Sequence, residues 1–445
     1  MKRIRWVAGV LFSAAALAQS PEAVLRSALA VKTGNVKLAA GVVEISREIV
    51  IPPDAHDLTI TAPATTIKAS AAFRGRALIV LTGSRNIKIQ GLTLDGNRDQ
   101  IGRPSGPAPS DGTWSRFVSN SGVIADGVNG LQLDAMKIGN IAGLGILVSA
   151  GRDIHIRGVD VTDSGGLNAA KQNNSTGGIL LEEGVTDFEV RDCRLGNVRG
   201  NGIWTRSLPR SAKNTKGLIS GNEFAMIGRN AIAVGEAATV RVEGNRGRGI
   251  GYPLEEVDLQ AKAAAVASVG DVGQSVFRGN QFEEVDGKCL ALDGFHDGEV
   301  SGNNCTNIDT LQHYPFGNFG ITLTGASAKN VQIRGNTIDG AVFGGILLSG
   351  SVNTVEDNHL LHLNLAHCND PGSINCVASS GQPDLLRSGI YLSAGSTSND
   401  VEGNEIVGYG MSRHCMGVAP GVSAGANKVQ HNECADDAAV AQLFK

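Results

Sequence analysis

Residues 277–308 read FRGNQFEEVDGKCLALDGFHDGEVSGNNCTNI and contain the pair Gly-Asn twice, at Gly279-Asn280 and Gly302-Asn303. The pair belongs to a column that runs through the second half of the chain, where the shortest intervals are about 23 residues. Longer intervals fit the same unit with a loop inserted. A repeat of this length is typical of a solenoid. The column consists of Asn222, Asn245, Asn280, Asn303, Asn336, Asn358, Asn404 and Asn432.

A second marker keeps step with the asparagines. Segments of the form Gly-Ile-x-Leu occur at 178–181, 320–323, 345–348 and 389–392, and each is followed by another short alternating segment, such as NVQIRGN at 330–336. Alternation with period two predicts strands whose Ile and Leu side chains point inward. The unit therefore holds two or three short strands per turn of chain, and the first half repeats it with weaker markers.

The asparagines have a structural explanation. Equivalent residues of a parallel solenoid stack about 4.8 Å apart, so an Asn in a turn can bond to the backbone and to the Asn of the next coil. The preceding Gly permits the tight bend. We therefore interpret the column as a structural ladder and not as a set of ligands.

Composition agrees with many short strands and turns, since 59 of 445 residues are Gly and only 4% are aromatic. The repeated units, together with GLTLDGN at 91–97, resemble those of the right-handed parallel β-helix proteins of the pectate-lyase-like superfamily. The resemblance covers residues 41–434 and implies an all-β fold. It leaves function open, because the same fold hosts lyases, hydrolases, epimerases, esterases and adhesins. The catalytic motifs of polygalacturonase-like proteins and pectate lyases have no counterpart here, so no catalytic set carries over.

We divide the chain into a signal peptide at 1–18, an N-terminal capping helix at 19–33, a right-handed parallel β-helix at 34–434 and a short C-terminal helical cap at 435–445. Lys2, Arg3 and Arg5 precede an apolar run that ends in the cleavage-site pattern Ala16-Leu17-Ala18. We therefore expect export to the periplasm or the cell exterior, with no membrane span after cleavage.

The two ends of the solenoid carry patterns typical of caps. Ser20 and Pro21 are typical of a helix start, and the helix is expected to present Val24, Leu25, Ala28 and Leu29 as one apolar stripe. At the other end, Asp436 and Asp437 are expected to open a short helix that carries Val440, Leu443 and Phe444. Both would cover the open ends of one continuous core.

Seven cysteines in an exported chain indicate disulfides. Cys368 and Cys376 flank the loop-like stretch CNDPGSINC, and Cys415 and Cys434 bracket the last turns, so we predict these two pairs. Cys193 alternates with apolar residues and is predicted to be a buried free thiol.

The resemblance implies that an extended polysaccharide binds along the outside of one sheet, between flanking loops. In Gly-Ile-x-Leu the x position and the residue after Leu point outward. These positions include Glu182, Trp204, Arg206, Asp293 and Tyr391, of which Trp204 and Tyr391 could stack on sugar rings. Glu236 follows next to this column, and Tyr314 lies in an insertion that could form a wall of the groove.

The stretch LDGFHDG places Asp293, His296 and Asp297 within five residues, whereas its sibling turns LTGAS, LSGSV and LSAGS are small and neutral. Hydrolysis would pair Asp293 with Glu182 or Glu236 across the bond. Elimination would use Arg206 and His296 as charge stabiliser and base, with Asp293 orienting the imidazole or helping to hold a cation. The alternative is that Asp293 caps a turn and His296 is a surface residue.

The leading hypothesis is an exported, monomeric enzyme that cleaves a polysaccharide by β-elimination or hydrolysis. The alternative is a non-catalytic glycan-binding or structural β-helix. Neither involves nucleic acid, because the chain has a net charge of −4 and no basic stripe. No metal site is predicted from cysteine or histidine spacing, and calcium is the one cofactor left open. The predicted catalytic residues are Asp293, His296, Glu182 and Arg206, and the predicted substrate contacts are Trp204, Tyr391, Glu236, Asp297 and Tyr314.

Overall fold

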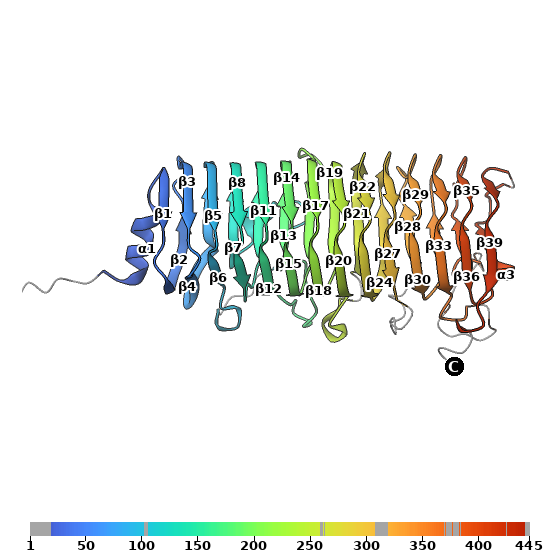
Figure 1. Ribbon diagram of the computed structural model, residues 1–445, viewed down its shortest axis with the longest axis horizontal. Coiled ribbons are helices and arrows are strands. Elements are labelled where there is room, and N and C mark those ends of the chain that lie inside the picture. The colour runs from blue at the N-terminus through green and yellow to red at the C-terminus, as the bar shows by residue number, and fades with distance from the viewer. Residues whose placement is uncertain are drawn as a thin grey trace, which may run out of the picture.

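The computed structural model describes residues 19–101, 106–258, 261, 263–307, 319–368, 370, 376, 382, 384–423 and 425–440. The chain winds into an elongated solenoid of parallel strands, with its blue N-terminal helix at one end and its red strands at the other (Figure 1). Each coil contributes a strand to each of three parallel sheets. The predicted signal peptide at 1–18 lies outside the described residues.

The three sheets follow one another around each coil, and strands of successive coils pair in parallel with their equivalents. The first sheet contains the ends of β2 (Gly41–Val50) and β4 (Thr65–Thr82), then β7 (Ser121–Asp126), β10 (Ile146–Ser149), β13 (Ile179–Glu182), β16 (Ile203–Arg206), the start of β19 (Ile232–Glu243), β21 (Ala263–Gly273), β24 (Gly287–Asp293), β28 (Ile321–Thr324), β31 (Ile346–Leu348), β34 (Ile390–Leu392) and β37 (Met416–Val418). The second sheet contains β1 (Gly34–Lys37), β3 (His56–Thr61), β5 (Arg85–Gln90), β8 (Asn129–Asp134), β11 (Arg152–Arg157), β14 (Thr186–Arg191), β17 (Asn214–Ser220), the end of β19, β22 (Val276–Arg278), β26 (Glu299–Ser301), β29 (Gln332–Arg334), β32 (Thr354–Glu356), β35 (Asp400–Glu402) and β38 (Lys428–Gln430). The third sheet contains the starts of β2 and β4, then β6 (Thr93–Asp95), β9 (Lys137–Gly139), β12 (Asp160–Ser164), β15 (Arg194–Val198), β18 (Glu223–Ile227), β20 (Arg246–Ile250), β23 (Gln281–Val285), β27 (Asn304–Thr306), β30 (Thr337–Ala341), β33 (His359–Leu363), β36 (Glu405–Gly408) and β39 (Glu433–Asp436).

The remaining elements are short and sit at turns. The strand β25 (Phe295–His296) pairs with the end of β21 between the first and second sheets. Long connections run from a third-sheet strand to the next first-sheet strand and project from one edge of the solenoid (Figure 1). They carry η1 (Arg98–Gln100), α2 (Trp114–Phe117), η2 (Leu254–Glu256) and α3 (Met411–His414).

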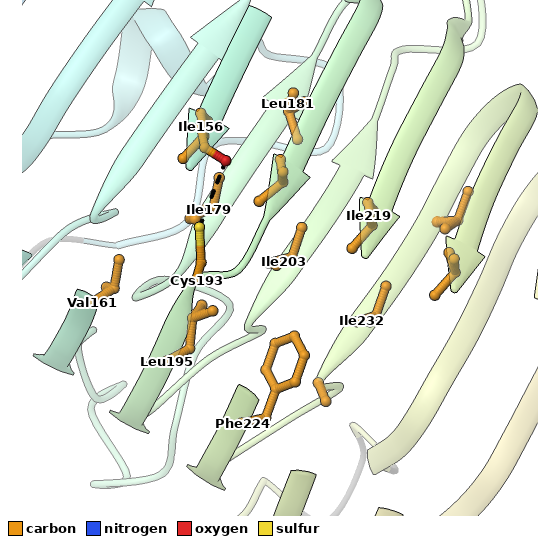
Figure 2. Close-up of a cluster of buried hydrophobic side chains, with 14 of the residues drawn as sticks. Ile156, Val161, Ile179, Leu181, Cys193, Leu195, Ile203, Ile219, Phe224 and Ile232 are labelled. Carbon is orange, nitrogen blue, oxygen red and sulfur yellow. Dashed lines mark hydrogen bonds between the residues drawn. The ribbon is translucent and has the colours of Figure 1, made fainter. Parts of the chain in front are cut away.

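The core is built from inward side chains that stack in register. Ile146, Ile179, Ile203 and Ile232 occupy one column of the first sheet, as the Gly-Ile-x-Leu pattern predicts. Figure 2 shows how three of them, Ile179, Ile203 and Ile232, meet residues from the other two sheets in a single cluster. Cys193 lies in that cluster as a free thiol, as predicted, and burial raises its pKa to about 12.

The asparagine ladder is confirmed. Asn222 donates its side-chain amide to the amide oxygen of Asn245 at 2.9 Å, and Asn245 donates to Asn280 at 2.9 Å. The pattern repeats without interruption to Asn432. Each oxygen also accepts the backbone N–H of the preceding Asn, for example from Asn222 at 3.0 Å. The ladder thus satisfies buried backbone donors at the turn between the second and third sheets.

Helix α1 (Pro21–Leu29) covers the N-terminal end of the core, with Ser20 accepting the backbone N–H of Ala23 at 3.2 Å. Leu25 and Leu29 are buried, but Val24 is 53% exposed. The apolar stripe that packs on the core is therefore narrower than the four residues predicted. At the C-terminus, Asp436 belongs to strand β39 and not to a helix, because the last coil still adds a strand to the third sheet. Leu443 and Phe444 lie outside the described residues.

Three disulfides link the second half of the chain. The predicted pairs Cys368–Cys376 and Cys415–Cys434 are both present. The third, Cys289–Cys305, was missed and joins a first-sheet strand to a third-sheet strand of the same coil. No helix in the described ranges is long and apolar enough to cross a membrane.

Candidate functional site

Two of the predicted catalytic residues hold a loop in place. Glu182 is fully buried on β13, and its two oxygens each accept a backbone N–H, from Trp114 and Ser115, at 2.8 Å. Arg206 lies 3.9 Å from the same carboxylate and donates to the carbonyl groups of Ser110 and Gly112. Burial raises the pKa of Glu182. Both charged groups are therefore occupied by the segment 106–120, which lies over the first sheet.

The aromatic residues predicted to stack on sugars are covered as well. Trp204 is only 7% exposed, and its ring meets that of Trp114 edge-to-face, with centroids 5.1 Å apart. Tyr391 is 1% exposed and packs in a cluster with Phe319 and Ala419. Neither ring offers a face to solvent. Tyr314 lies outside the described residues.

Asp293, by contrast, is exposed at the end of β24 and accepts the hydroxyl of Thr324 at 3.3 Å. His296 lies in a chain of charged groups at the adjacent turn. Its Nδ1 is 2.7 Å from Asp297, and its Nε2 is 2.8 Å from Asp271, which Lys213 contacts at 2.6 Å. The hydrogen bond to Asp297, followed by that to Asp271, raises the pKa of His296. Both ring nitrogens are engaged, so neither is available to abstract a proton.

The predicted carboxylate pair Asp293 and Glu182 is too widely separated for glycoside hydrolysis. Their strands β13 and β24 are four ladder steps apart, through β16, β19 and β21. At about 4.8 Å per step this is ~19 Å, well beyond the ~9.5 Å limit for a carboxylate pair. The prediction that these residues share one groove is wrong, because loop 106–120 covers one end and the column extends too far. Glu236 is only two steps from Asp293, so that pair stays a prediction.

A different surface is open and hollow. A trough of about 470 Å³ lies on the outer face of the third sheet and crosses strands β12 to β27. In its first coils the floor is made of small residues, including Gly196 and Ala225, and the same column continues with the charged residues Arg248 and Glu283. A Cβ added to Gly196 would meet only Thr162 Cγ2, at 3.8 Å, so the space above it is empty. Charged and amide side chains of the neighbouring column border the floor: Arg194, Glu223, Arg246, Gln281 and Asn304.

The core beneath the trough is tightly filled. Gly247 points inward between Phe224 and Phe282, whose centroids are 6.2 Å apart. A Cβ added at Gly247 would lie 2.8 Å from Phe224 Cβ and 2.8 Å from Phe282 Cε1. Leu195 and Phe224 project into the same core (Figure 2). The floor is thus a rigid sheet and not a loop.

Ion pairs hold the border of the trough. Glu223 accepts hydrogen bonds from Arg246 and from Arg194, the latter at 3.3 Å, and these bonds lower the pKa of Glu223. Arg248 bonds to Glu284. This arrangement offers hydrogen-bond donors and acceptors beside an unobstructed stretch of floor at Gly196 and Ala225, which suits binding. The described residues contain no group of three or more His, Cys, Asp or Glu side chains that could hold a metal ion.

Comparison with known proteins agrees with this architecture. A family model for the right handed beta helix region matches residues 178–360 and 266–434, which together exceed half of the chain. The chain belongs to the right-handed β-helix family. No curated protein matches this β-helix in sequence.

Solved structures share the fold of this β-helix at low identity. The surface adhesin PfbA of Streptococcus pneumoniae is 14% identical over 77% of this chain and 85% of its own, with a TM-score of 0.55. The N-terminal fragment of bacteriophage Phi29 gene product 12 is 11% identical over 91% of this chain and 66% of its own, with a TM-score of 0.50. The mannuronan C-5 epimerase AlgE4 A-module of Azotobacter vinelandii is 13% identical over 76% of this chain and 96% of its own, with a TM-score of 0.48. At these identities the likeness concerns the fold alone.

The trough could have been found from the ladder. The residue that follows each ladder asparagine opens a third-sheet strand and points outward, as Glu223, Arg246, Gln281 and Asn304 do. The Gly-Ile-x-Leu strands, by contrast, form the first sheet of this β-helix, so their outward positions give no information about the third sheet.

Proposed function

We propose that this β-helix is an exported protein that binds an extended polysaccharide in the third-sheet trough and does not cleave it. The observation that carries the proposal is the trough itself, which crosses the five ladder steps from β12 to β27. Five steps correspond to a length of ~24 Å, at about 4.8 Å per coil. The length of one coil step is close to that of one pyranose ring, so several sugars would lie along the axis.

The lining suits sugars chemically. The C–H face of a pyranose ring can pack against Gly196 and Ala225, where no side chain blocks it. Hydroxyl groups at the ring edges can bond to Arg194, Glu223 and Gln281. Side chains held by ion pairs lose less conformational entropy on binding, which favours affinity.

Export is supported by the disulfides, since such bonds persist in oxidising compartments. The pneumococcal surface adhesin of similar fold is an instance in which a β-helix serves adhesion. A binding role also agrees with the engagement of Glu182, Arg206 and His296 in internal contacts.

The test is a panel of neutral and acidic polysaccharides, measured by isothermal titration calorimetry with the purified mature chain. Gly196→Trp should fill the trough and abolish binding. Gly106→Trp is the matched control, because a Cβ at Gly106 also meets empty space but lies in the loop over the first sheet. Equal binding by both variants, or no binding to any chain of the panel, would contradict the proposal.

The same mixtures are assayed for cleavage, by new reducing ends and by ultraviolet absorbance of unsaturated products. We expect neither signal. Product formation that is lost in Asp293→Asn and Glu236→Gln would show an enzyme, using the one predicted carboxylate pair that the register leaves close.

A further inference from the structure

The outward column beside the trough floor alternates in sign along the solenoid. In successive coils it consists of Lys137, Asp160, Arg194, Glu223 and Arg246, each in register with the next. Because coils are about 4.8 Å apart, cations recur every ~10 Å with one carboxylate between them. After Arg246 the column becomes neutral, with Gln281 and Asn304.

The middle of this column is ordered and still open to solvent. Glu223 holds both neighbouring arginines, through Arg194 Nε and Arg246 Nη2. Each guanidinium carries five N–H donors, so these bonds use a minority of them. The two arginine side chains are 70% and 69% exposed, which leaves their outer edges accessible to a ligand.

We propose that the trough selects a linear glycan that carries an anionic group on every second sugar. The inference rests on the proposed function and names the ligand class of the same site. With one sugar per coil, such a chain places its anions against Arg194 and Arg246 and a neutral sugar against Glu223. A chain with a carboxylate on every sugar sets one directly against Glu223, and that repulsion offsets the attraction.

The experiment compares three probes of equal length by calorimetry at low ionic strength: a hyaluronan octasaccharide with a carboxylate on every second sugar, an oligogalacturonate with one on every sugar, and a neutral chitin oligosaccharide. We expect the hyaluronan probe to bind about tenfold more tightly than the other two, and the preference to shrink in salt, which screens exposed charges over ~10 Å at 0.1 M. Arg194→Gln and Arg246→Gln should each weaken hyaluronan binding by about three- to tenfold.

Glu223→Gln provides the discriminating variant. Removing the carboxylate between the arginines should strengthen oligogalacturonate binding and reduce the preference. Arg334→Gln is the matched control, because Arg334 pairs with Glu299 on the second sheet, away from the trough, and is about as exposed, at 52%. That variant should bind all probes as the parent does.

The outcomes separate the two claims. Equal affinity for hyaluronan and oligogalacturonate, or an unchanged ratio of these two affinities in Glu223→Gln, would overturn the charge selection. The alternating column would then contribute only to the stability of the fold. If binding is then still lost in Gly196→Trp, polysaccharide binding in the trough stands. No binding of the hyaluronan probe would overturn the ligand class proposed here, whereas the proposed function falls only if no polysaccharide of the wider panel binds.

Discussion

The asparagine ladder gives the sharpest prediction for stability, at Asn280. Its side-chain oxygen accepts two bonds from Asn245, from the backbone at 3.1 Å and from the amide at 2.9 Å. Its amide donates to the carbonyl of Val242 at 3.0 Å and to Asn303 at 2.8 Å. The residue is buried, so water cannot replace these partners at no cost.

Replacing Asn280 by Ala removes all four bonds. The amide of Asn245 keeps its bond to the carbonyl of Ile219, and the oxygen of Asn303 keeps the backbone N–H of residue 280. The buried backbone N–H of Asn245 loses its partner. One buried group left unsatisfied costs about 1–3 kcal/mol, and the other three lost bonds add about 1 kcal/mol each, so we expect the free energy of unfolding to fall by about 4–6 kcal/mol.

The assay is equilibrium urea unfolding of Asn280→Ala beside Asn432→Ala. Asn432 is the last rung: its oxygen also accepts from the preceding Asn, but it is only half-buried, so exposed groups can bond to water. We expect its loss to cost about 1 kcal/mol. A cost for Asn280 no greater than that for Asn432 would refute the claim that burial of the rung determines its contribution.

Other parts of the structure give further predictions. Gly247→Leu should destabilise the fold by about 1–3 kcal/mol through overpacking against Phe224 and Phe282, whereas the outward Gly196→Leu should be near neutral; thermal melting compares them, and equal effects would contradict the inward placement of Gly247. Glu182→Gln places an amide N–H₂ against one of the two backbone N–H donors of the loop, which should release the loop from the first sheet. We expect red-shifted tryptophan fluorescence, because Trp114 and Trp204 become exposed, and faster proteolysis within 106–120. An unchanged spectrum would argue against Glu182 as the anchor of the loop. The pKa of His296 is raised above 6.5, so its contribution to stability is present below that pH and is lost as pH rises through the folded-state pKa. The difference in unfolding free energy between the parent and His296→Gln should therefore be larger at about pH 5 than at about pH 9. A constant difference would contradict the ion-pair network.

The repeat made most of the fold predictable from sequence. Parallel strands in a solenoid stack equivalent residues, so the Ile of one coil must meet the Ile of the next, as Ile179 and Ile203 do. The same stacking of equivalent residues made the asparagine ladder and the buried thiol of Cys193 predictable. Short-range features at the ends were less secure, because they depend on packing that the repeat does not encode, as the exposure of Val24 and the strand at Asp436 show.

The predicted exposure of Glu182 and Trp204 in an open groove is wrong for a reason that period-two patterns cannot reveal. Alternation predicts that Glu182 and Trp204 point out of the coil, and they do. It cannot predict whether another segment of the chain covers these side chains. The segment that covers Glu182 is about 68 residues earlier in sequence, and its contact is made through two backbone N–H groups, which leave no trace in residue type.

The trough and the outer face of the first sheet differ in the size of their outward side chains. On the first sheet, bulky outward residues such as Leu180 and Trp204 form an outer apolar cluster, and such a surface is stable only when a loop covers it. On the third sheet, the outward positions are Gly196, Ala225 and charged residues, which need no cover. Outward side-chain size, tabulated by column, therefore separates a face that is packed by a loop from a face that is open to a ligand. Applied to aligned coils, that criterion marks the first sheet as covered, but the second sheet also carries charged outward residues such as Glu189 and Arg241, so side-chain size alone does not single out the third sheet.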